Sequence, residues 1–413
     1  MHRIRQSLGY YEEFGWKPTV VTVHSDYVEG AQDPLLEQTL PEGLRVIRVK
    51  AFSTKYTRKV GLGSLALRSL WFYWRAVNKL LKEERFDLVF FSTTQFPVMI
   101  LGAYWKRRFG IPFVIDMQDP WHTDYYLSKP KSERPPKYWF AYRLNKWLEP
   151  IAMRRVDAII AVTSAYCDTL RERYPHISES QCHEIPFGVS PKDYEVAESH
   201  TEEPPYFQAA KDRLRIVYTG VVNSAMLITI RAILTAFRNG LPETPRWEGV
   251  HFFFIGTNYA PEGMQKQMVA PIASELGISA HVTEITGRIG YFEALKIQQS
   301  ADLLLLPGTQ DEAYTPSKVY NYVASRKPIF TVFHQKSNVN AILKNLGRPV
   351  QVNFSSGESA DSLADRILPA LVQEIARLPF MPDTDWEAFG PYTAKERARK
   401  QVEVFFEVEK VRR

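Results

Sequence analysis

The chain has 413 residues, with 45% hydrophobic and 24% charged side chains and a formal net charge of +6. This length allows two or three domains, and the balance is ordinary for a globular protein. The mild positive charge suits an anionic small ligand or an acidic membrane surface and is too weak to indicate nucleic-acid binding.

Cysteine usage and hydropathy indicate a cytoplasmic location. Cys167 and Cys182 are the only cysteines, and they form neither a disulfide framework nor a metal-ligand spacing, which points to a reducing compartment. The sequence shows no signal-peptide pattern and no apolar run long enough to span a bilayer. We therefore expect a cytoplasmic protein.

The first half of the chain alternates between helical and strand patterns. Helices are predicted at residues 2–14, 65–81, 96–109 and 137–155 and after Thr163, and strands at residues 19–23, 45–49, 87–92, 113–116 and 157–162. This alternation predicts a parallel sheet with helices on both faces. A Rossmann-like half normally begins with a strand and a glycine-rich turn, whereas a helix comes first here. We therefore expect an unpaired strand edge or a groove in the first sheet.

The composition changes between residues 190 and 212, where acidic and proline residues indicate a linker. Further strands are predicted at residues 215–218, 251–255, 282–286, 302–307 and 328–333, and three of them run into a glycine. This series predicts a second Rossmann-like domain, followed by an amphipathic helix at residues 393–410. The expected divisions are residues 1–195, a linker at 196–212, residues 213–385, and a C-terminal segment at 386–413 that packs back on the first domain.

The stretch that follows the apolar strand at residues 302–307 is the main candidate binding element. Thr315, Pro316 and Ser317 lead into a helix whose first turn carries Lys318 and Asn321. Free backbone N–H groups and the positive end of the helix dipole suit a phosphate, and Lys318 adds a full charge. An ordinary strand–helix connection would have the same pattern.

Residues 316–328 (PSKVYNYVASRKP) resemble the donor-binding element of family 4-like glycosyltransferases with the GT-B fold, which often reads P-S-K-x-x-E-Y-x-A-x-x-(R/K)-P. The segments FFFIGT and GRIGYFEAL, with the DLLLLP strand after them, resemble the same C-terminal half. Asn321 stands where the family has its ribose-binding Glu. Ala313 stands at the first Glu of the family's E-x7-E pair, with Glu312 one residue away. An Asn can still hydrogen-bond a ribose hydroxyl but supplies no charge.

The resemblance implies an α/β protein with two Rossmann-like domains facing across a cleft, an acceptor-side domain followed by a nucleotide-sugar domain. Its activity would be transfer of a sugar from a nucleoside diphosphate sugar to an acceptor hydroxyl, with retention, in polysaccharide or glycolipid biosynthesis. The donor is a substrate, and no cofactor is implied. The partners would be the nucleotide sugar and a carbohydrate or lipid-linked acceptor.

The same resemblance assigns Arg288 and Lys318 to the donor diphosphate, and Gly220 would let the backbone approach the phosphates. Alternatively, Arg288 and Lys318 are ordinary surface cations, and Gly220 belongs to an ordinary turn at the end of a strand. Relatives often have an Arg and a Lys–Gly after the turn that contains Gly220. This chain has residues 221–225 (VVNSA) there instead, so that part of the phosphate clamp differs.

Three side chains are candidates for acceptor chemistry: Asp116, Asp119 and His122. The segment DMQDPW at residues 116–121 is similar to the D-x-R-D-P-W stretch of some family 4-like transferases. A carboxylate or imidazole here can orient or deprotonate a hydroxyl. The alternative for Asp119 is a cap on the turn before Pro120.

Two further patterns have competing interpretations. Residues 383–385 (DTD) spell a metal motif of another transferase fold, but their place in a turn explains them, and we expect no essential metal.

Aromatic and cationic residues occur together at 65–81 and 138–147, as in a membrane-surface face or a buried core. Peripheral membrane contact is thus an open expectation. A non-catalytic nucleotide-sugar-binding protein and a GT-B epimerase remain alternative functions.

Overall fold

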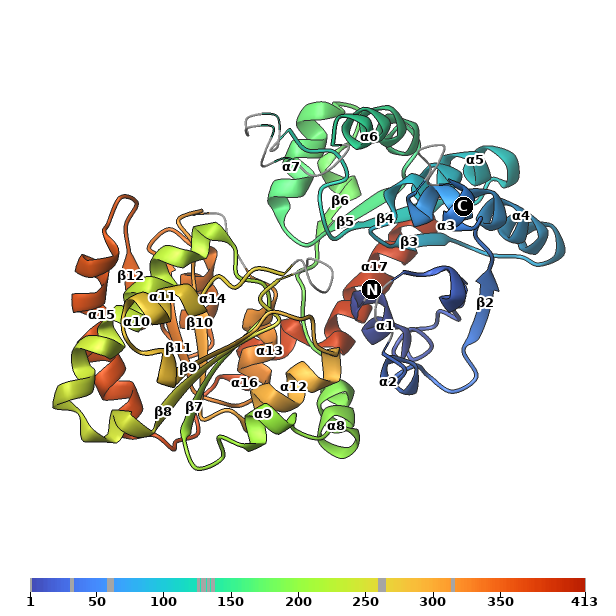
Figure 1. The fold of residues 1–413 in the computed structure, drawn as a ribbon. Coiled ribbons are helices and arrows are strands. Elements are labelled where there is room, and N and C mark those ends of the chain that lie inside the picture. Colours follow the sequence, from blue (N-terminus) through green and yellow to red (C-terminus); the bar gives the residue numbers. More distant parts are fainter. Residues whose placement is uncertain are drawn as a thin grey trace. The chain divides into compact units, whose positions relative to one another are not determined.

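The structure is a computed structural model that describes residues 2–29, 33–57, 63–124, 127, 131, 134, 138–258, 265–312 and 316–412 (Figure 1). The chain divides into two compact units: unit 1 comprises Met1–Phe187 and Ala394–Arg413, and unit 2 comprises Gly188–Thr393. Residues 196–212, expected to be a linker, instead contain the end of helix α8 (Pro191–His200) and the whole of α9 (Pro205–Gln208). Both helices begin at a proline, a residue well suited to the first helical position because its φ is already helical.

Unit 2 is built on a six-stranded parallel sheet. Its strands are β7 (Leu214–Thr219), β8 (Val250–Ile255), β9 (Val282–Ile285), β10 (Leu303–Pro307), β11 (Ile329–His334) and β12 (Val352–Phe354). Their spatial order is β12-β11-β10-β7-β8-β9. The strand order therefore reverses between β7 and β10, and the carboxyl ends of these two strands mark the place where open parallel sheets bind ligands.

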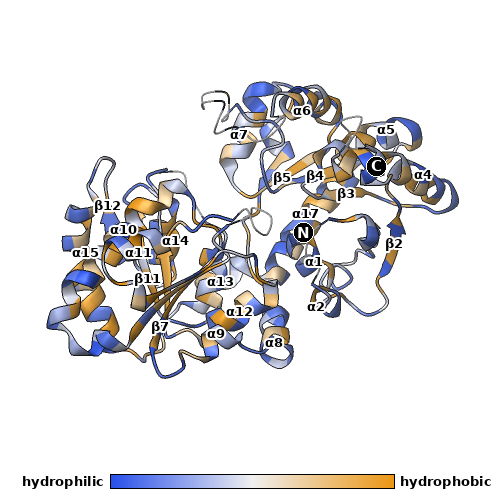
Figure 2. Ribbon diagram, in the orientation of Figure 1, coloured by the Kyte–Doolittle hydropathy of each residue, from blue (hydrophilic) through white to orange (hydrophobic). Residues whose placement is uncertain are grey.

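Helices cover the sheet of unit 2 because its strands are apolar on both faces. They are α10 (Leu227–Gly240), α11 (Ala270–Glu275), α12 (Tyr291–Ser300), α13 (Lys318–Ala324), α14 (Asn338–Asn345), α15 (Ala360–Arg377) and α16 (Trp386–Phe389). Helices α10 and α15 pack together and share one core with the strands. Figure 2 shows the apolar strands between helices with polar outer faces. The second Rossmann-like domain predicted from the sequence is confirmed.

The strands of unit 1 form two separate parallel sheets. One pairs β1 (Thr19–Val23) with β2 (Arg45–Val49), and the other contains β3 (Val89–Ser92), β4 (Phe113–Met117), β5 (Ala158–Ala161) and β6 (Cys182–Glu184), in that order. Within the described residues no ladder joins β1 to β3. The expected interruption of the first sheet is therefore present in the structure.

In the described part of unit 1, the longer helices around these sheets are α1 (His2–Leu8), α4 (Leu65–Glu83), α5 (Ile100–Phe109), α6 (Tyr138–Met153), α7 (Ser164–Arg173) and α17 (Ala394–Arg412). Two short ones, α2 (Leu35–Gln38) and α3 (Thr54–Thr57), lie in connections. Helix α1 ends well before residue 14, because Gly9 follows it and glycine disfavours a helix interior.

Helix α17 belongs to unit 1, where it packs against α1. The Tyr11 hydroxyl donates to Gln401 Oε1 at 2.7 Å, and Arg397 Nη2 donates to Gln6 Oε1 at 2.9 Å. These polar contacts are buried and satisfy groups that would otherwise lose their hydration. Among the described helices, none combines the length and the apolar character needed to cross a membrane.

Candidate active site

The carboxyl end of β7 brings Gly220 and Lys318 together. Gly220 follows β7 with φ +117°, a conformation that favours glycine. A Cβ added to Gly220 would lie 2.8 Å from Lys318 Nζ, so the ammonium group rests against the bare glycine backbone. Two candidates separated by almost a hundred positions in the chain thus meet at the place where the strand order of unit 2 reverses.

Tyr218, the penultimate residue of β7, holds the Lys318 ammonium group. Nζ donates to the Tyr218 hydroxyl at 2.6 Å and lies 3.9 Å from the centre of the ring. The hydroxyl in turn donates to the Val221 carbonyl at 2.7 Å. Burial lowers the pKa of Lys318 to about 7, because removal from water disfavours the charged form. No carboxylate pairs with Lys318 among the described residues, so an anion that entered the site would meet an uncompensated cation.

Two tyrosines fix helix α13 relative to the site. The Tyr322 hydroxyl accepts from the Thr219 backbone N–H at 2.9 Å, which ties α13 to the end of β7. The Tyr194 hydroxyl, on α8, donates to the Asn321 backbone carbonyl at 2.7 Å. The half-buried Asn321 side chain makes no hydrogen bond to the described residues. Asn321 is therefore positioned through its backbone while its amide is unengaged.

The remaining donor-side candidates lie at the same edge of the sheet. The glycine turns after β7, β8 and β9 are adjacent, since a Cβ on Gly256 would lie 3.9 Å from both Gly220 N and Gly287 O. Arg288 follows the third of these turns and is exposed, with no ion-pair partner in the described part of the chain. Pro316 is buried at the start of α13.

Two donor-side candidates are less well placed or not described. Ser317 is exposed and occupies the N-cap position of α13, but its side chain makes no capping hydrogen bond. Thr315 lies outside the described residues.

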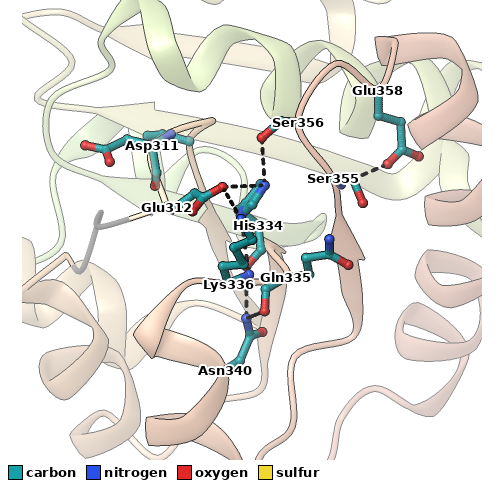
Figure 3. Close-up of polar contacts among 10 residues, drawn as sticks. Asp311, Glu312, His334, Gln335, Lys336, Asn340, Ser355, Ser356 and Glu358 are labelled. Carbon is teal, nitrogen blue, oxygen red and sulfur yellow. Dashed lines mark hydrogen bonds and ion pairs between the residues drawn. The ribbon is translucent and has the colours of Figure 1, made fainter.

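Glu312 is anchored at the carboxyl ends of β10 to β12 (Figure 3). Its Oε1 lies 3.0 Å from Lys336 Nζ and 4.0 Å from His334 Nε2. The same imidazole nitrogen is 3.1 Å from Ser356 Oγ, and Asn340 Nδ2 donates to the His334 carbonyl at 2.9 Å. The carboxylate next to the expected E-x7-E position is thus held by neighbouring cationic and polar groups.

In unit 1, Asp116 at the end of β4 lies in a fully buried ion pair. Its Oδ1 is 3.1 Å from Arg3 Nε, and both side chains are completely inaccessible. Ser92 Oγ and Gln118 Nε2 donate to the other carboxylate oxygen at 2.7 and 3.1 Å. The Arg3 guanidinium also donates to the Ile185 carbonyl at 2.7 Å. Asp116 therefore links α1 to the sheet and has no open face for a substrate.

Asp119 is exposed to solvent, whereas His122 is buried together with both of its ring nitrogens. Asp119 is exposed, has no partner among the described residues, and has its pKa raised by partial loss of hydration. His122 is buried, and burial followed by the charge of Arg173 lowers its pKa. Both ring nitrogens of His122 lack hydrogen-bond partners, although Nδ1 lies 3.9 Å from Glu149 Oε2. A neutral imidazole with a free nitrogen can accept a proton.

The residues 383–385 serve a structural purpose. Asp385 caps α16, because its Oδ1 accepts from the Ala388 backbone N–H at 2.8 Å. Elsewhere in the described part of the chain, no group of three or more His, Cys, Asp or Glu side chains is arranged to hold a metal ion.

Sequence reasoning missed Tyr218 and Tyr194. An aromatic residue in an apolar strand is typical of a core position, and Tyr218 is indeed 1% exposed. Its hydroxyl and one face of its ring nevertheless contact Lys318 Nζ. Tyr194 lies in the acidic stretch that suggested a linker. No local pattern marks either residue, since both act through partners that are distant in the sequence.

Comparison with known proteins supports a glycosyltransferase. Residues 10–193 match the model of Glycosyltransferase Family 4. No curated protein matches the chain. The trehalose-6-phosphate phosphatase N-terminal domain of Candida albicans is similar with TM-score 0.61 and 14% identity, covering 98% of this chain and 92% of that one. HepE of Anabaena, in complex with UDP and glucose, has TM-score 0.59 and 13% identity, covering 98% and 94%.

A glycosyltransferase from Rickettsia africae is similar with TM-score 0.58 and 13% identity, covering 98% of this chain and 93% of that one. At these identities the likeness shows the fold, and the family match supplies the class. The family match over residues 10–193 and the shared fold together support a family 4-like glycosyltransferase, and the fold of the chain is two Rossmann-like domains of the GT-B type.

Proposed function

We propose that this chain transfers a sugar from a nucleoside diphosphate sugar to an acceptor hydroxyl, with the donor diphosphate bound by Lys318 and Arg288. The observation that carries the proposal is the Lys318 ammonium group, which rests against Gly220 at the end of β7 without a carboxylate partner in the described residues. Charge develops on the leaving diphosphate as the glycosidic bond breaks, and fixed cations in a partly dry site stabilise it.

A uridine donor is the first choice. HepE of Anabaena, whose fold this chain shares, was solved with UDP and with UDP-glucose. The unengaged amide of Asn321, one helical turn beyond Lys318, suits a ribose hydroxyl through neutral hydrogen bonds. Gly220, Lys318 and Asn321 would then contact successive parts of one nucleotide.

On the acceptor side we assign His122 and Asp119 to the incoming hydroxyl. Both ring nitrogens of His122 lack hydrogen-bond partners, so one of them is available to accept a proton from a hydroxyl brought against the ring. Asp119 is exposed with a free carboxylate. The transfer would proceed with retention, to a carbohydrate or lipid-linked acceptor of polysaccharide or glycolipid synthesis.

The test begins with a thermal-shift screen of UDP, GDP and ADP and their sugars, since a ligand of the folded state raises its stability. The best donor is then incubated with the protein and a panel of carbohydrate and lipid-linked acceptors. Nucleotide release is measured with wild type, Lys318→Met and the control Lys344→Met, an exposed lysine elsewhere in unit 2. Loss of release in Lys318→Met alone supports the proposal, and equal release in all three proteins refutes it.

The products distinguish the remaining alternatives. Retention is tested by NMR, which compares the anomeric configuration of the new glycosidic bond with that of the donor. Conversion of the donor to an epimeric nucleotide sugar would show an epimerase. Tight nucleotide binding with no release over a panel of acceptors would show a binding protein.

A further inference from the structure

Helices α4 and α5 of unit 1 enclose a groove of about 330 Å³ that no part of the proposed transfer uses. We propose that this groove, here called the α4–α5 groove, binds the phosphate headgroup of an anionic phospholipid and docks unit 1 on a bilayer surface. It lies wholly on the described residues of unit 1, so the inference is independent of the proposed donor site.

The charge of the groove is strongly positive. Arg75, Lys79 and Lys82 come from α4 and Arg108 from α5, and all four are exposed. Glu83 is the single carboxylate among the lining residues, and it lies 3.9 Å from Lys79 Nζ. Arg75, Lys82 and Arg108 have no carboxylate partner in the described part of the chain. This excess of uncompensated cations favours an anion over a neutral or basic ligand.

The walls are aromatic and open to solvent. Trp74 and Tyr104 line the groove from opposite helices with ring centres 6.3 Å apart, and they are 38% and 39% exposed. Trp71, one turn before Arg75 on α4, is 45% exposed, and the Arg75 guanidinium lies 5.5 Å from the centre of its ring. Tryptophan and tyrosine favour the boundary between headgroups and acyl chains, because their rings are apolar and carry one polar group.

The groove also offers a neutral hydrogen-bond donor. Asn78 is buried, and its Oδ1 accepts from Trp105 Nε1 at 3.1 Å, which fixes the orientation of the amide. The amide nitrogen has no partner among the described residues, and Asn78 lines the groove. A phosphate oxygen can therefore accept from a donor that is already positioned, in addition to the surrounding cations.

The spacing along α4 places these groups on one side of the helix. Trp71, Trp74, Asn78 and Lys82 follow one another at three or four residues, so they form a continuous stripe. Aromatic and cationic residues on a single helical stripe match a surface that lies at the level of lipid headgroups. A soluble phosphate would need the cations but not the exposed rings, which is why we commit to a lipid surface.

The experiment is flotation of the full chain with vesicles of phosphatidylcholine, and of an equal mixture of phosphatidylcholine and phosphatidylglycerol. We expect binding to the mixed vesicles only, and a steep loss when salt is raised, since exposed charges are screened. Each lysine near an anionic surface strengthens partition by about fivefold, so Lys79→Gln with Lys82→Gln should weaken it about 25-fold. Trp74→Ala should weaken it independently of salt.

The matched control is Lys211→Gln with Lys344→Gln, which removes the same charge from exposed positions of unit 2. This control should bind like wild type. Circular dichroism of each variant checks that the fold is retained, and Asn78→Asp provides a second probe. It keeps the acceptor for Trp105 but places a negative charge in the groove, and it should abolish binding.

Three results would overturn the proposal: no binding to the mixed vesicles, equal binding to both kinds of vesicle, or equal weakening by the groove and control pairs. A fourth such result is that the protein binds inorganic phosphate in calorimetry, in a way that depends on Lys79 and Lys82, but does not bind vesicles. That outcome would assign the groove to a soluble anion instead.

Discussion

The low pKa of Lys318 predicts that nucleotide binding is accompanied by proton uptake. Burial lowers that pKa to about 7, so at pH 8 about 0.9 of the free protein has a neutral Lys318 amine. A diphosphate against Nζ favours the charged form and raises the pKa in the complex. The bound state therefore holds more protons than the free state above pH 7, and the affinity must fall as pH rises.

The magnitude follows from the shift. Each pH unit above the free pKa costs about tenfold in affinity, or about 1.4 kcal/mol, until the pKa of the complex is reached. If the complex restores an ordinary lysine pKa near 10.5, UDP should bind about 50-fold more weakly at pH 9 than at pH 7. UDP itself contributes little to this change, because a terminal phosphate has its second pKa near about 6.

The assay is isothermal titration calorimetry with UDP at pH 8, in two buffers with different ionisation enthalpies. The difference between the two enthalpies gives the number of protons taken up, which should be about 0.9 per UDP bound. Lys318→Met should bind weakly and take up none, while Lys344→Met should behave like wild type. Uptake near zero in the wild-type protein would refute the assignment of Lys318 to the diphosphate.

The remaining predictions concern three other positions. Arg288→Ala should lower turnover by about 100-fold and nucleotide affinity much less, because the charge of Arg288 acts on the leaving group. The melting temperature of the variant should equal that of the wild-type protein. Wild-type kinetics in this variant would remove Arg288 from the site. Asn321→Ala should weaken UDP binding by about 1 kcal/mol in calorimetry, the usual cost of a lost neutral hydrogen bond, and an unchanged affinity would argue against a ribose contact. Arg3→Met should destabilise unit 1 by about 3–5 kcal/mol in urea unfolding, since it leaves the Asp116 carboxylate buried without its partner. Addition of Asp116→Asn should recover part of that loss, and a fully additive double variant would contradict a direct pair.

The sequence predicted the strands and the larger helices well, because their apolar periodicity is a local property. It also placed Gly220 and Lys318 after strands of the same predicted domain, and the resemblance assigned both to the donor phosphates. Their direct contact, and the Tyr218 hydroxyl that completes it, depend on how α13 packs on β7. That packing is a tertiary property that no local pattern reveals.

Other features could not be read from the sequence for related reasons. Asp116 looked like an acceptor-side residue because it stands at a strand end, and only the fold shows that Arg3 covers it. The acidic and proline content between residues 190 and 212 predicts a linker at 196–212. Pro191 and Pro205 instead occupy the first positions of α8 and α9, and the contacts of Tyr194 with α13 and of Asp193 with α12 hold α8 in place.

The packing of α17 on α1 has a consequence for the order in which the two units fold. Unit 2 is a single continuous segment, Gly188–Thr393, whereas unit 1 needs residues from both sides of it. During synthesis the side chains of Arg397 and Gln401 leave the ribosome after all of unit 2. Until then their partners Gln6, on α1, and Tyr11, just after it, are uncovered together with the apolar residues beside them.

Contacts between residues so distant in the chain form slowly, because the intervening chain must be closed into a loop first. We therefore expect unit 2 to reach its native state while unit 1 still lacks part of its core. In that interval the uncovered face of α1 and the open edges of β1 and β3 would be the surfaces most exposed to aggregation and to chaperone binding.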